Sequence, residues 1–146
     1  MADAIAIRPA QPEDPDAWLP LWEGCNAFYE RRGPAAVSEA QTRTTWSRFF
    51  EGDEPMEALA GFAHIVFHRN TTVMGPTCYL QDLFAAPSMR GKGVGRALIE
   101  AAAARTKEAG ATRLYWPTQA GNATARLLYD RIGRDSGFVV YRMALA

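Results

Sequence analysis

A short run of glycine and basic residues near the middle of the chain has the composition of a phosphate-binding turn. It reads Met-Arg-Gly-Lys-Gly-Val-Gly-Arg over residues 89–96, between an apolar run and a helix-forming run. Glycine lets the backbone turn sharply and approach a ligand, and the first amides of a helix lack partners and lie at the positive end of its dipole. We predict that this turn holds a pyrophosphate. The residues concerned are Arg90, Gly91, Lys92, Gly93, Val94, Gly95 and Arg96.

Two common phosphate motifs do not fit this turn. The dinucleotide fingerprint G-x-G-x-x-G needs a glycine where Arg96 stands, and the Walker motif needs Ser or Thr where Gly93 follows Lys92. The pattern Gln/Arg-x-x-Gly-x-Gly/Ala does fit, at Arg90, Gly93 and Gly95. In this pattern the chain resembles the acyl-CoA pyrophosphate signature of the GNAT superfamily of N-acetyltransferases. An ordinary glycine-rich surface turn is the simpler alternative.

Two further segments carry the same resemblance. Residues 79–84, Tyr-Leu-Gln-Asp-Leu-Phe, are similar to a strand of the histone/polyamine-type GNAT enzymes, and residues 115–118 with 122–129 look like their second acyl-CoA motif. The resemblance extends from about residue 61 to residue 141. It implies a GNAT-like acyl-CoA N-acyltransferase fold of the α/β class, in which helices flank a central twisted mixed sheet (α+β). We expect a single domain over residues 1–146.

The resemblance also implies how acetyl-CoA, the expected co-substrate, is bound. In the family, the strand before the phosphate turn bulges and splays from its neighbour, and its backbone pairs with the pantetheine arm. Here those groups belong to Leu83, Phe84 and Ala85, and Asn122 would bind the pantetheine region. Tyr129 matches the tyrosine near the thioester sulfur, where a phenol can protonate the departing thiolate. Plain core packing is the alternative for Tyr129, and no metal is implied.

The acceptor amine must lose a proton before it attacks the thioester. For a lysine-like amine this costs roughly 4–5 kcal/mol at pH 7. The polyamine-type relatives have a glutamate, acting through water, where this chain has Gln81, and an amide accepts no proton at neutral pH. Asp82 matches a residue that holds a cationic substrate, so it is predicted to be the anchor, the base, or both. His64 is another candidate base, although a structural histidine is the simpler interpretation.

Three residues near the N-terminus and one near the second motif are predicted to border the acceptor together with Asp82. Phe28, Tyr29 and Glu30 fall where GNAT folds place a substrate-covering helix pair. An aromatic wall with one carboxylate suits a cation, although helix packing explains Phe28 equally well. Trp116 either borders the site or fills the core.

Hydrophobic periodicity and turn residues predict the elements that carry these residues. Strands are expected at residues 5–8, 58–68, 77–85, 112–116 and 137–143, and helices at 14–29, 38–50, 94–109 and 122–131. Some of the first residues of the second strand would form a separate strand, with a turn near Met56. Asp14 or Asp16 is expected to cap the first helix, and Pro15 suits its first turn. Ser38 and Gln41 form a capping box, and Gly110 ends the third helix.

The bulk composition excludes several classes of protein. The chain has 146 residues, 48% of them hydrophobic, which is ordinary for one globular domain. Its 16 basic and 16 acidic residues balance, so we expect no nucleic-acid partner. No apolar run is long enough to span a membrane, and no signal peptide is visible. Cys25 and Cys78 show neither metal-ligand spacing nor a disulfide framework, as expected for a cytoplasmic protein.

The function that fits best is an acetyl-CoA-dependent N-acetyltransferase that acts directly on a primary amine, without an acyl-enzyme. A polyamine or another small cationic amine is the favoured acceptor; a protein lysine or N-terminus is second, and an aminoglycoside-like amine is third. A non-catalytic acyl-CoA sensor is the alternative of another class, favoured by Gln81. A homodimer is expected because relatives often dimerise. The apolar residues 138–141 would form either a core strand or an exchanged strand.

Overall fold

The chain contains two compact units, residues 1–115 and residues 116–146. The computed structural model describes residues 5–31, 36–48, 56–57 and 61–145. Within that part of the chain, the first unit carries the sheet with helices α1, α2 and α3, and the second carries helix α4. That residues 1–146 act as one domain stays a prediction.

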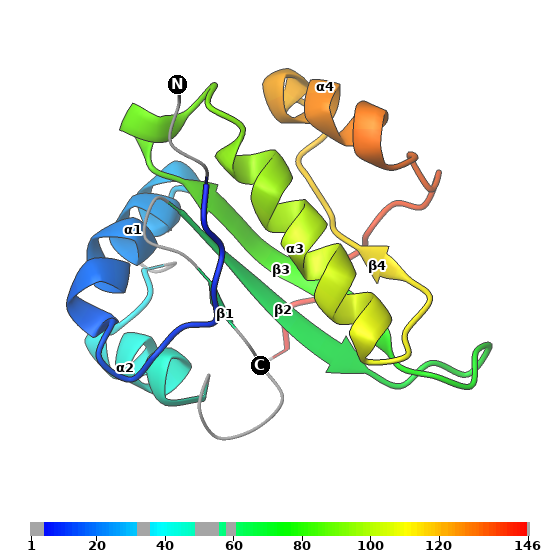
Figure 1. The fold of residues 1–146 in the computed structure, drawn as a ribbon, viewed down its shortest axis with the longest axis horizontal. Coiled ribbons are helices and arrows are strands. Elements are labelled where there is room, and N and C mark those ends of the chain that lie inside the picture. The colour runs from blue at the N-terminus through cyan, green and yellow to red at the C-terminus, as the bar shows by residue number, and fades with distance from the viewer. Residues whose placement is uncertain (1–4, 32–35, 49–55, 58–60, 146) are drawn as a thin grey trace. The chain divides into compact units, whose positions relative to one another are not determined.

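A mixed sheet forms the centre of the first unit (Figure 1). Its strands are β1 (Met56–Glu57), β2 (Gly61–His68), β3 (Thr77–Ala85) and β4 (Leu114–Tyr115), in that spatial order. The β1–β2 and β2–β3 pairs are antiparallel, whereas β3 and β4 are parallel. Helix α3 (Val94–Glu108) is the crossover that a parallel pair requires. The predicted fold class, a mixed sheet flanked by helices, is confirmed.

Helices α1 (Pro15–Phe28) and α2 (Glu39–Arg48) cover one face of the sheet. The buried cluster there consists of Trp18, Leu21, Trp22, Cys25, Phe62 and Phe84. Trp46 of α2 packs against this cluster, with its ring 5.0 Å from that of Trp18. Gly24 permits the close approach of α1 to the sheet, since a Cβ there would lie 2.9 Å from the ring of Phe84.

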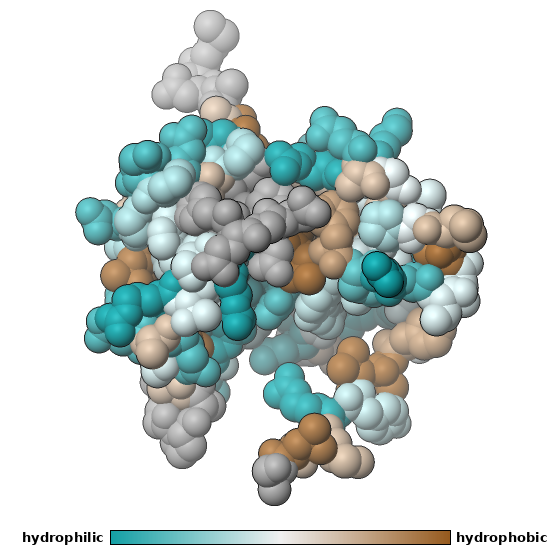
Figure 2. Space-filling model, turned by 90° about the horizontal axis from the view of Figure 1, so that it is seen from below, coloured by the Kyte–Doolittle hydropathy of each residue, from teal (hydrophilic) through white to brown (hydrophobic). Residues whose placement is uncertain are grey.

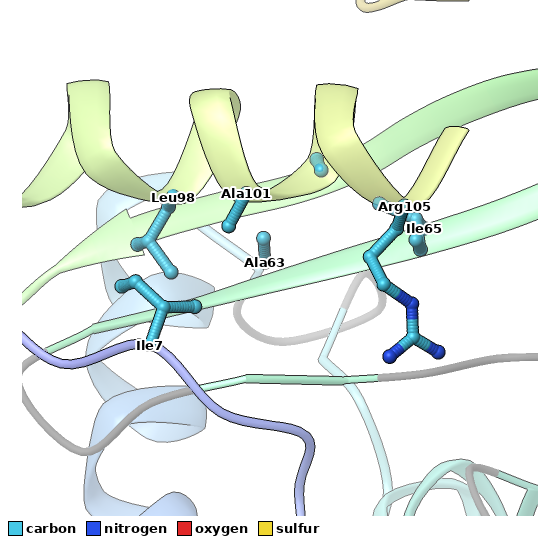
Figure 3. Close-up of a pocket in the computed structure, with 7 residues that line it drawn as sticks. Ile7, Ala63, Ile65, Leu98, Ala101 and Arg105 are labelled. Carbon is cyan, nitrogen blue, oxygen red and sulfur yellow. The ribbon is translucent and has the colours of Figure 1, made fainter. Parts of the chain in front are cut away.

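Helix α3 covers the opposite face and lies across β2 and β3 (Figure 1). Its buried side chains are Val94, Leu98, Ile99, Ala102 and Thr106. A small pocket remains between α3 and β2, with Ile7 of the N-terminal segment opposite Leu98 (Figure 3). The pocket lining is apolar apart from Arg105. We therefore interpret this pocket as a packing gap rather than as a site for a polar substrate.

The helix boundaries follow the predicted signals with one exception. The capping box is present: the Ser38 amide donates to Gln41 Oε1 at 2.8 Å, and the Gln41 amide donates to Ser38 Oγ at 3.1 Å. Gly110 follows α3 with a φ of 77°. Asp14 stands at the N-cap position of α1, but its carboxylate makes no capping bond. Arg8 donates to it twice instead, at 2.7 and 2.9 Å.

Two predicted strands are wrong. Residues 5–8 form no strand, and only an isolated bridge occurs at Pro9, which has no N–H to extend a ladder. Residues 137–143 form no strand either, because residues 116–145 contain no other strand with which they could pair. The predicted strand at 112–116 shortens to Leu114–Tyr115. Residues 49–50 and 58–60, also assigned to predicted elements, lie outside the described residues.

The segment that follows α4 exposes a row of large apolar side chains. Phe138, Val139, Val140, Tyr141, Met143 and Leu145 are each at least 74% exposed. Figure 2 shows one face of the molecule, on which hydrophobic residues lie singly or in small groups among hydrophilic ones. The C-terminal segment is therefore an unusual concentration of exposed apolar surface.

Candidate functional site

The turn between β3 and α3 has the backbone geometry of an anion-binding loop. A short 3-10 turn, η2 (Pro87–Met89), leads into Gly91 and Gly93, whose φ angles are 77° and 83°. A residue with a Cβ adopts this left-handed conformation at a cost of about 1–2 kcal/mol. A Cβ at either position would meet no atom within 4 Å. The conformation, not a lack of space, therefore requires glycine at both positions.

The start of α3 offers backbone amides to a ligand. Gly93 is the N-cap residue, and its carbonyl accepts the first intrahelical bond, from the Ala97 amide at 3.0 Å. The amides of Val94, Gly95 and Arg96 precede that bond and so have no acceptor within the helix. The predicted pyrophosphate residues thus converge on the positive end of a 15-residue helix. Their contacts with the ligand stay predictions.

The three basic side chains of this turn have different surroundings: two lie on the surface, and the third packs against aromatic rings. Arg96 Nε donates to Glu100 Oε1 at 2.8 Å on the surface of α3, and Lys92 is exposed. The guanidinium of Arg90 lies 5.7 Å from the ring centroid of Phe28 and 5.8 Å from that of Phe84. Arg90 is therefore held between the end of α1 and β3.

Strand β3 diverges from its parallel neighbour before it reaches the turn. It pairs with β2 as far as Ala85, but with β4 only at Cys78 and Tyr79. Among the described residues, the β4-facing edge of β3 from Leu80 onward has no ladder partner. The divergence that the resemblance implied is therefore present, and it leaves the β4-facing backbone groups of residues 83–85 without a strand partner.

A β-bulge in β3 is centred on Gln81. Asp82 pairs with His64 and Leu80 pairs with Ile65, so Gln81 is the extra residue. A bulge changes the direction of the side chains on either side of it. Leu80 therefore shares the α3 face with Ile65, whereas Asp82 shares the α1 face with His64. Gln81 itself is exposed, and Asp82 is buried.

Asp82 is the centre of a buried polar network on the α1 face. His64 Nδ1 lies 3.0 Å from Asp82 Oδ2, and Arg31 Nη2 donates to Asp82 Oδ1 at 3.4 Å. The indole Nε1 of Trp18 donates to His64 Nε2 at 3.4 Å. Because an indole can only donate, Nε2 is the acceptor, and we assign the ring proton to Nδ1. Neutral His64 then donates to Asp82, and both of its nitrogens are engaged.

The network keeps Asp82 ionised in spite of its burial. Burial by itself would raise the pKa of this carboxyl. The hydrogen bonds from His64 and Arg31, together with the charge of Arg31, outweigh that effect, so the pKa of Asp82 is lowered from its usual 3.8. The geometry therefore favours a role for Asp82 in positioning its two partners. That it also anchors the amine stays a prediction.

The turn that ends α1 places Arg31 beside Asp82. Glu30 has a φ of 55°, and the amides of Glu30 and Arg31 donate to the carbonyls of Ala27 and Asn26 at 3.1 and 2.9 Å. This is a Schellman motif in which glutamate occupies the position usually taken by glycine. Arg31 then folds back, and its Nη1 donates to Asn26 Oδ1 at 2.7 Å.

Phe28 and Tyr29, which are predicted to border the acceptor, lie together at the end of α1. Their rings meet edge to face at 5.1 Å, and they are 49% and 36% exposed. The Arg31 guanidinium lies 5.0 Å from the Tyr29 centroid, and Arg90 lies over Phe28. Cationic groups of the protein itself therefore already approach these two rings. Glu30, the predicted carboxylate, is exposed.

The second unit contains the other predicted site residues. Asn122 is the N-cap residue of α4 (Ala123–Ile132), and its Nδ2 donates to Thr118 Oγ1 at 3.4 Å. Trp116 and Tyr129 contact each other edge to face, with ring centroids 5.5 Å apart. Burial raises the pKa of the Tyr129 phenol, so it stays protonated at neutral pH. The unit thus brings Trp116 and Tyr129 together, and their functional roles stay predictions.

The two cysteines are poor nucleophiles. Cys25 and Cys78 are free and fully buried. Burial, reinforced by the charge of Asp82, raises the pKa of Cys25 to about 12, so almost no thiolate forms at neutral pH. No cluster of three or more potential metal ligands occurs among the described residues. No helix in the same part of the chain is long and apolar enough to cross a membrane.

Comparisons with known proteins agree with this geometry. The sequence model of the acetyltransferase (GNAT) family matches residues 6–133. The D-amino-acid N-acetyltransferase HPA3 of Saccharomyces cerevisiae is 32% identical over 150 residues, which cover 96% of this chain and 91% of that protein. Aminoglycoside N(6')-acetyltransferase type 1 of Stenotrophomonas maltophilia is 29% identical, with 99% and 97% coverage.

A solved structure supports the fold independently. The aminoglycoside acetyltransferase AAC(6')-Iy, in complex with a CoA-containing bisubstrate analogue, superimposes with a TM-score of 0.80. The match covers 97% of this chain and 98% of that one, at 16% identity. At that identity the likeness concerns the fold.

Proposed function

Because the chain belongs to the acetyltransferase (GNAT) family, we propose that it transfers the acetyl group of acetyl-CoA to the primary amine of a small molecule. The observation that carries this proposal is that one segment, residues 83–96, has backbone groups without a strand or helix partner at both of its ends. The open edge of β3 near Leu83 lies at its start, the left-handed turn of Gly91 and Gly93 lies between, and the first amides of α3 lie at its end. An extended pantetheine arm suits the first part, and a pyrophosphate suits the last.

The proposed reaction is a direct transfer between the two substrates. The amine nitrogen attacks the thioester carbonyl, a C–N bond forms, the C–S bond breaks, and CoA leaves as a thiolate. The low reactivity of Cys25 and Cys78 supports transfer without an acyl-enzyme. Tyr129 donates a proton to the thiolate, and its raised pKa keeps that proton available. The proton that the amine nitrogen loses when the amide forms passes through solvent and restores the phenol. Tyr129→Phe should lower kcat while acetyl-CoA binding is retained, and an unchanged kcat contradicts this role.

The amine reaches the thioester in its neutral form without a strong protein base. Gln81 cannot accept a proton, and both nitrogens of His64 are already engaged. We propose that Gln81 orients the amine or a water molecule beside it, and that solvent takes the proton. The rate should then rise with pH towards the pKa of the amine itself. Gln81→Glu should extend activity to lower pH, and an unchanged pH profile contradicts this assignment.

The acceptor is proposed as a small primary amine, with the polyamines as one member of that class. The preference for a polyamine depended on the Asp82 carboxylate, and both of its oxygens already accept hydrogen bonds from other residues. Similar proteins act on chemically different amines, as their descriptions as D-amino-acid and aminoglycoside acetyltransferases indicate. This variety supports the class of small amines rather than any one of them.

We also propose a homodimer that uses the C-terminal segment. Its row of exposed apolar side chains, from Phe138 to Leu145, would be costly to leave in water. An extended segment without a strand partner can pair with a second copy of the chain. Light scattering should give the mass of a dimer, and Val140→Asp should reduce it to that of a monomer. A monomeric wild-type protein contradicts the proposal.

The proposed function is tested by thiol release from acetyl-CoA. Spermidine, spermine, a lysine peptide and an aminoglycoside are supplied separately, with an acceptor-free reaction as the control. We expect acceptor-dependent release with at least one small amine. Release with the lysine peptide alone would instead indicate a protein acetyltransferase. Tight acetyl-CoA binding by calorimetry, with no release for any amine, would indicate a sensor module.

A further inference from the structure

The end of α1 holds the side chain of Arg31 in one place. Its Nη1 donates to Asn26 at 2.7 Å, and its guanidinium lies 5.0 Å from the Tyr29 ring and 5.7 Å from the Trp22 ring. The left-handed Glu30 that directs Arg31 backwards is unfavourable for a residue with a Cβ. Strain of this kind persists where its surroundings enforce it and is concentrated at functional sites. Arg31 is therefore more rigid than an ordinary surface arginine.

Asp82 does not use the full binding capacity of this guanidinium. An arginine binds a carboxylate most strongly through two parallel N–H bonds. Asp82 accepts one bond from Arg31, at the long distance of 3.4 Å, and takes its shorter contact from His64. The described contacts of Arg31 leave further N–H donors available, and its side chain is 30% exposed. Arg31 can thus bind a second anionic group.

The charges around Arg31 favour an anion over a cation. Arg90 lies at the other end of the same aromatic pair, over Phe28. The buried carboxylate of Asp82 is compensated by Arg31 and by the His64 hydrogen bond. The exposed carboxylate at this turn is Glu30, which can attract a cation from solvent. The competing hypothesis is therefore that Glu30 binds a cationic acceptor, and an experiment must exclude it.

We propose that Arg31 binds a carboxylate of the acceptor, so that the substrate is an amino acid with its primary amine and carboxylate on one small molecule. This inference rests on the proposed function, because it names the acceptor of that transfer. Asp82, which Arg31 contacts, lies on the stretch of β3 whose β4-facing edge is open, next to Leu83 of the proposed donor site. Consecutive residues of a strand are about 3.3 Å apart along its axis. A carboxylate on Arg31 therefore places the acceptor beside the part of β3 with which the donor is proposed to pair.

Three matched acceptors test the need for a carboxylate in the wild-type enzyme. Leucine, tested as both enantiomers, carries the amine and the carboxylate; leucinamide replaces the carboxylate by an amide; 3-methylbutylamine lacks it. Each kcat/KM is divided by the neutral fraction of that amine, because the three amines differ in pKa. We expect one leucine enantiomer to exceed both analogues at least about tenfold, as for a charge-assisted hydrogen bond. Equal values, or a preference for 3-methylbutylamine, overturn the inference.

Substitution of Arg31 separates recognition from a structural role. Arg31→Gln should lower kcat/KM for leucine about 10- to 100-fold and change the value for 3-methylbutylamine less than about threefold. Arg31→Lys keeps the positive charge but loses the paired N–H donors of the guanidinium, so we expect an intermediate loss in kcat/KM for leucine. This variant replaces Arg31→Gln in the test if the glutamine variant does not fold. Arg43→Gln, an exposed arginine on α2, is the matched control. An equal loss for both acceptors means that Arg31 only supports Asp82, which overturns the inference.

Three hypotheses give different experimental results: a cation anchor at Glu30, a carboxylate site at Arg31, and the acetyltransferase function itself. Glu30→Gln should keep the preference for leucine over 3-methylbutylamine, whereas a several-fold loss for 3-methylbutylamine with no leucine preference would identify Glu30 as a cation anchor. Turnover of spermidine or an aminoglycoside without turnover of leucine would overturn the inference and leave the proposed function intact. No turnover with any of these amines would overturn both.

Discussion

The donor side and the acceptor side of the proposed site are built in different ways. The donor side is the continuous stretch of residues 83–96, and it offers backbone amides and an open strand edge. The acceptor side depends on side-chain contacts between different elements. It combines Trp18 of α1 and Arg31 of the turn after α1 with His64 of β2 and Asp82 of β3. Local spacing therefore encodes the proposed acetyl-CoA site, whereas tertiary packing builds the proposed acceptor site.

Removal of the carboxylate at the centre of the network should have the largest effect on stability. Asp82→Ala leaves the Nδ1–H of His64 buried without an acceptor and removes the carboxylate partner of Arg31. We expect the free energy of unfolding, measured by urea titration, to fall by about 3 kcal/mol. Asp82→Asn keeps the shape and an acceptor oxygen, so it should lose less. An alanine variant as stable as the wild type would show that the network is not a structural unit.

A substitution in the glycine turn should instead weaken the donor side. Gly93→Ala forces a Cβ into a φ of 83°, so we expect the turn to shift and the KM for acetyl-CoA to rise about tenfold. Gly95 has no positive φ, and Gly95→Ala is the matched control with a nearly unchanged KM. Both KM values come from initial rates at saturating acceptor. Equal effects of the two variants contradict the conformational argument.

The lowered pKa of Asp82 predicts how the stability of the network depends on pH. A carboxyl whose pKa is lower in the folded state contributes stability above its unfolded pKa, and this stability is lost as pH falls through the folded value. The difference in unfolding free energy between the wild type and Asp82→Asn should therefore be constant above about pH 5 and shrink below about pH 4. Urea titrations at several pH values measure it. A difference that grows on acidification has the wrong sign for this account.

Relief of the strained turn should have the smallest effect. Glu30→Gly removes the Cβ from a residue with a φ of 55°, and we expect a gain of about 1 kcal/mol in unfolding free energy. Ala27→Gly, in the last turn of α1, is the control and should lose about 1 kcal/mol. A loss at both positions would show that Glu30 makes favourable contacts that exceed the backbone strain.

The donor side was largely predictable from the sequence because its residues are neighbours in the chain. The spacing of Arg90, Gly93 and Gly95 marked the turn, and the bounds of β3 and the capping box of α2 also matched the structure. The bulge at Gln81 follows from the family resemblance rather than from any periodicity.

The acceptor side could not be predicted in the same way. Trp18 and His64 are 46 positions apart, and no spacing rule connects them. The backbone turn that directs Arg31 towards Asp82 has a glutamate where glycine is the usual signal. The sequence indicates only that His64 is titratable, because its two hydrogen-bond partners, Trp18 and Asp82, come from other elements. The prediction of a strand at residues 137–143 was wrong for a related reason. An apolar segment forms a strand only if a partner strand is available.

The most direct test of this division is steady-state kinetics with both substrates varied, for the wild type, Gly93→Ala and Arg31→Gln. We predict that Gly93→Ala raises the KM for acetyl-CoA alone, and that Arg31→Gln raises the KM for the amino-acid acceptor alone. If each variant raised both KM values by similar factors, the donor and the acceptor would not be recognised by separate parts of the molecule.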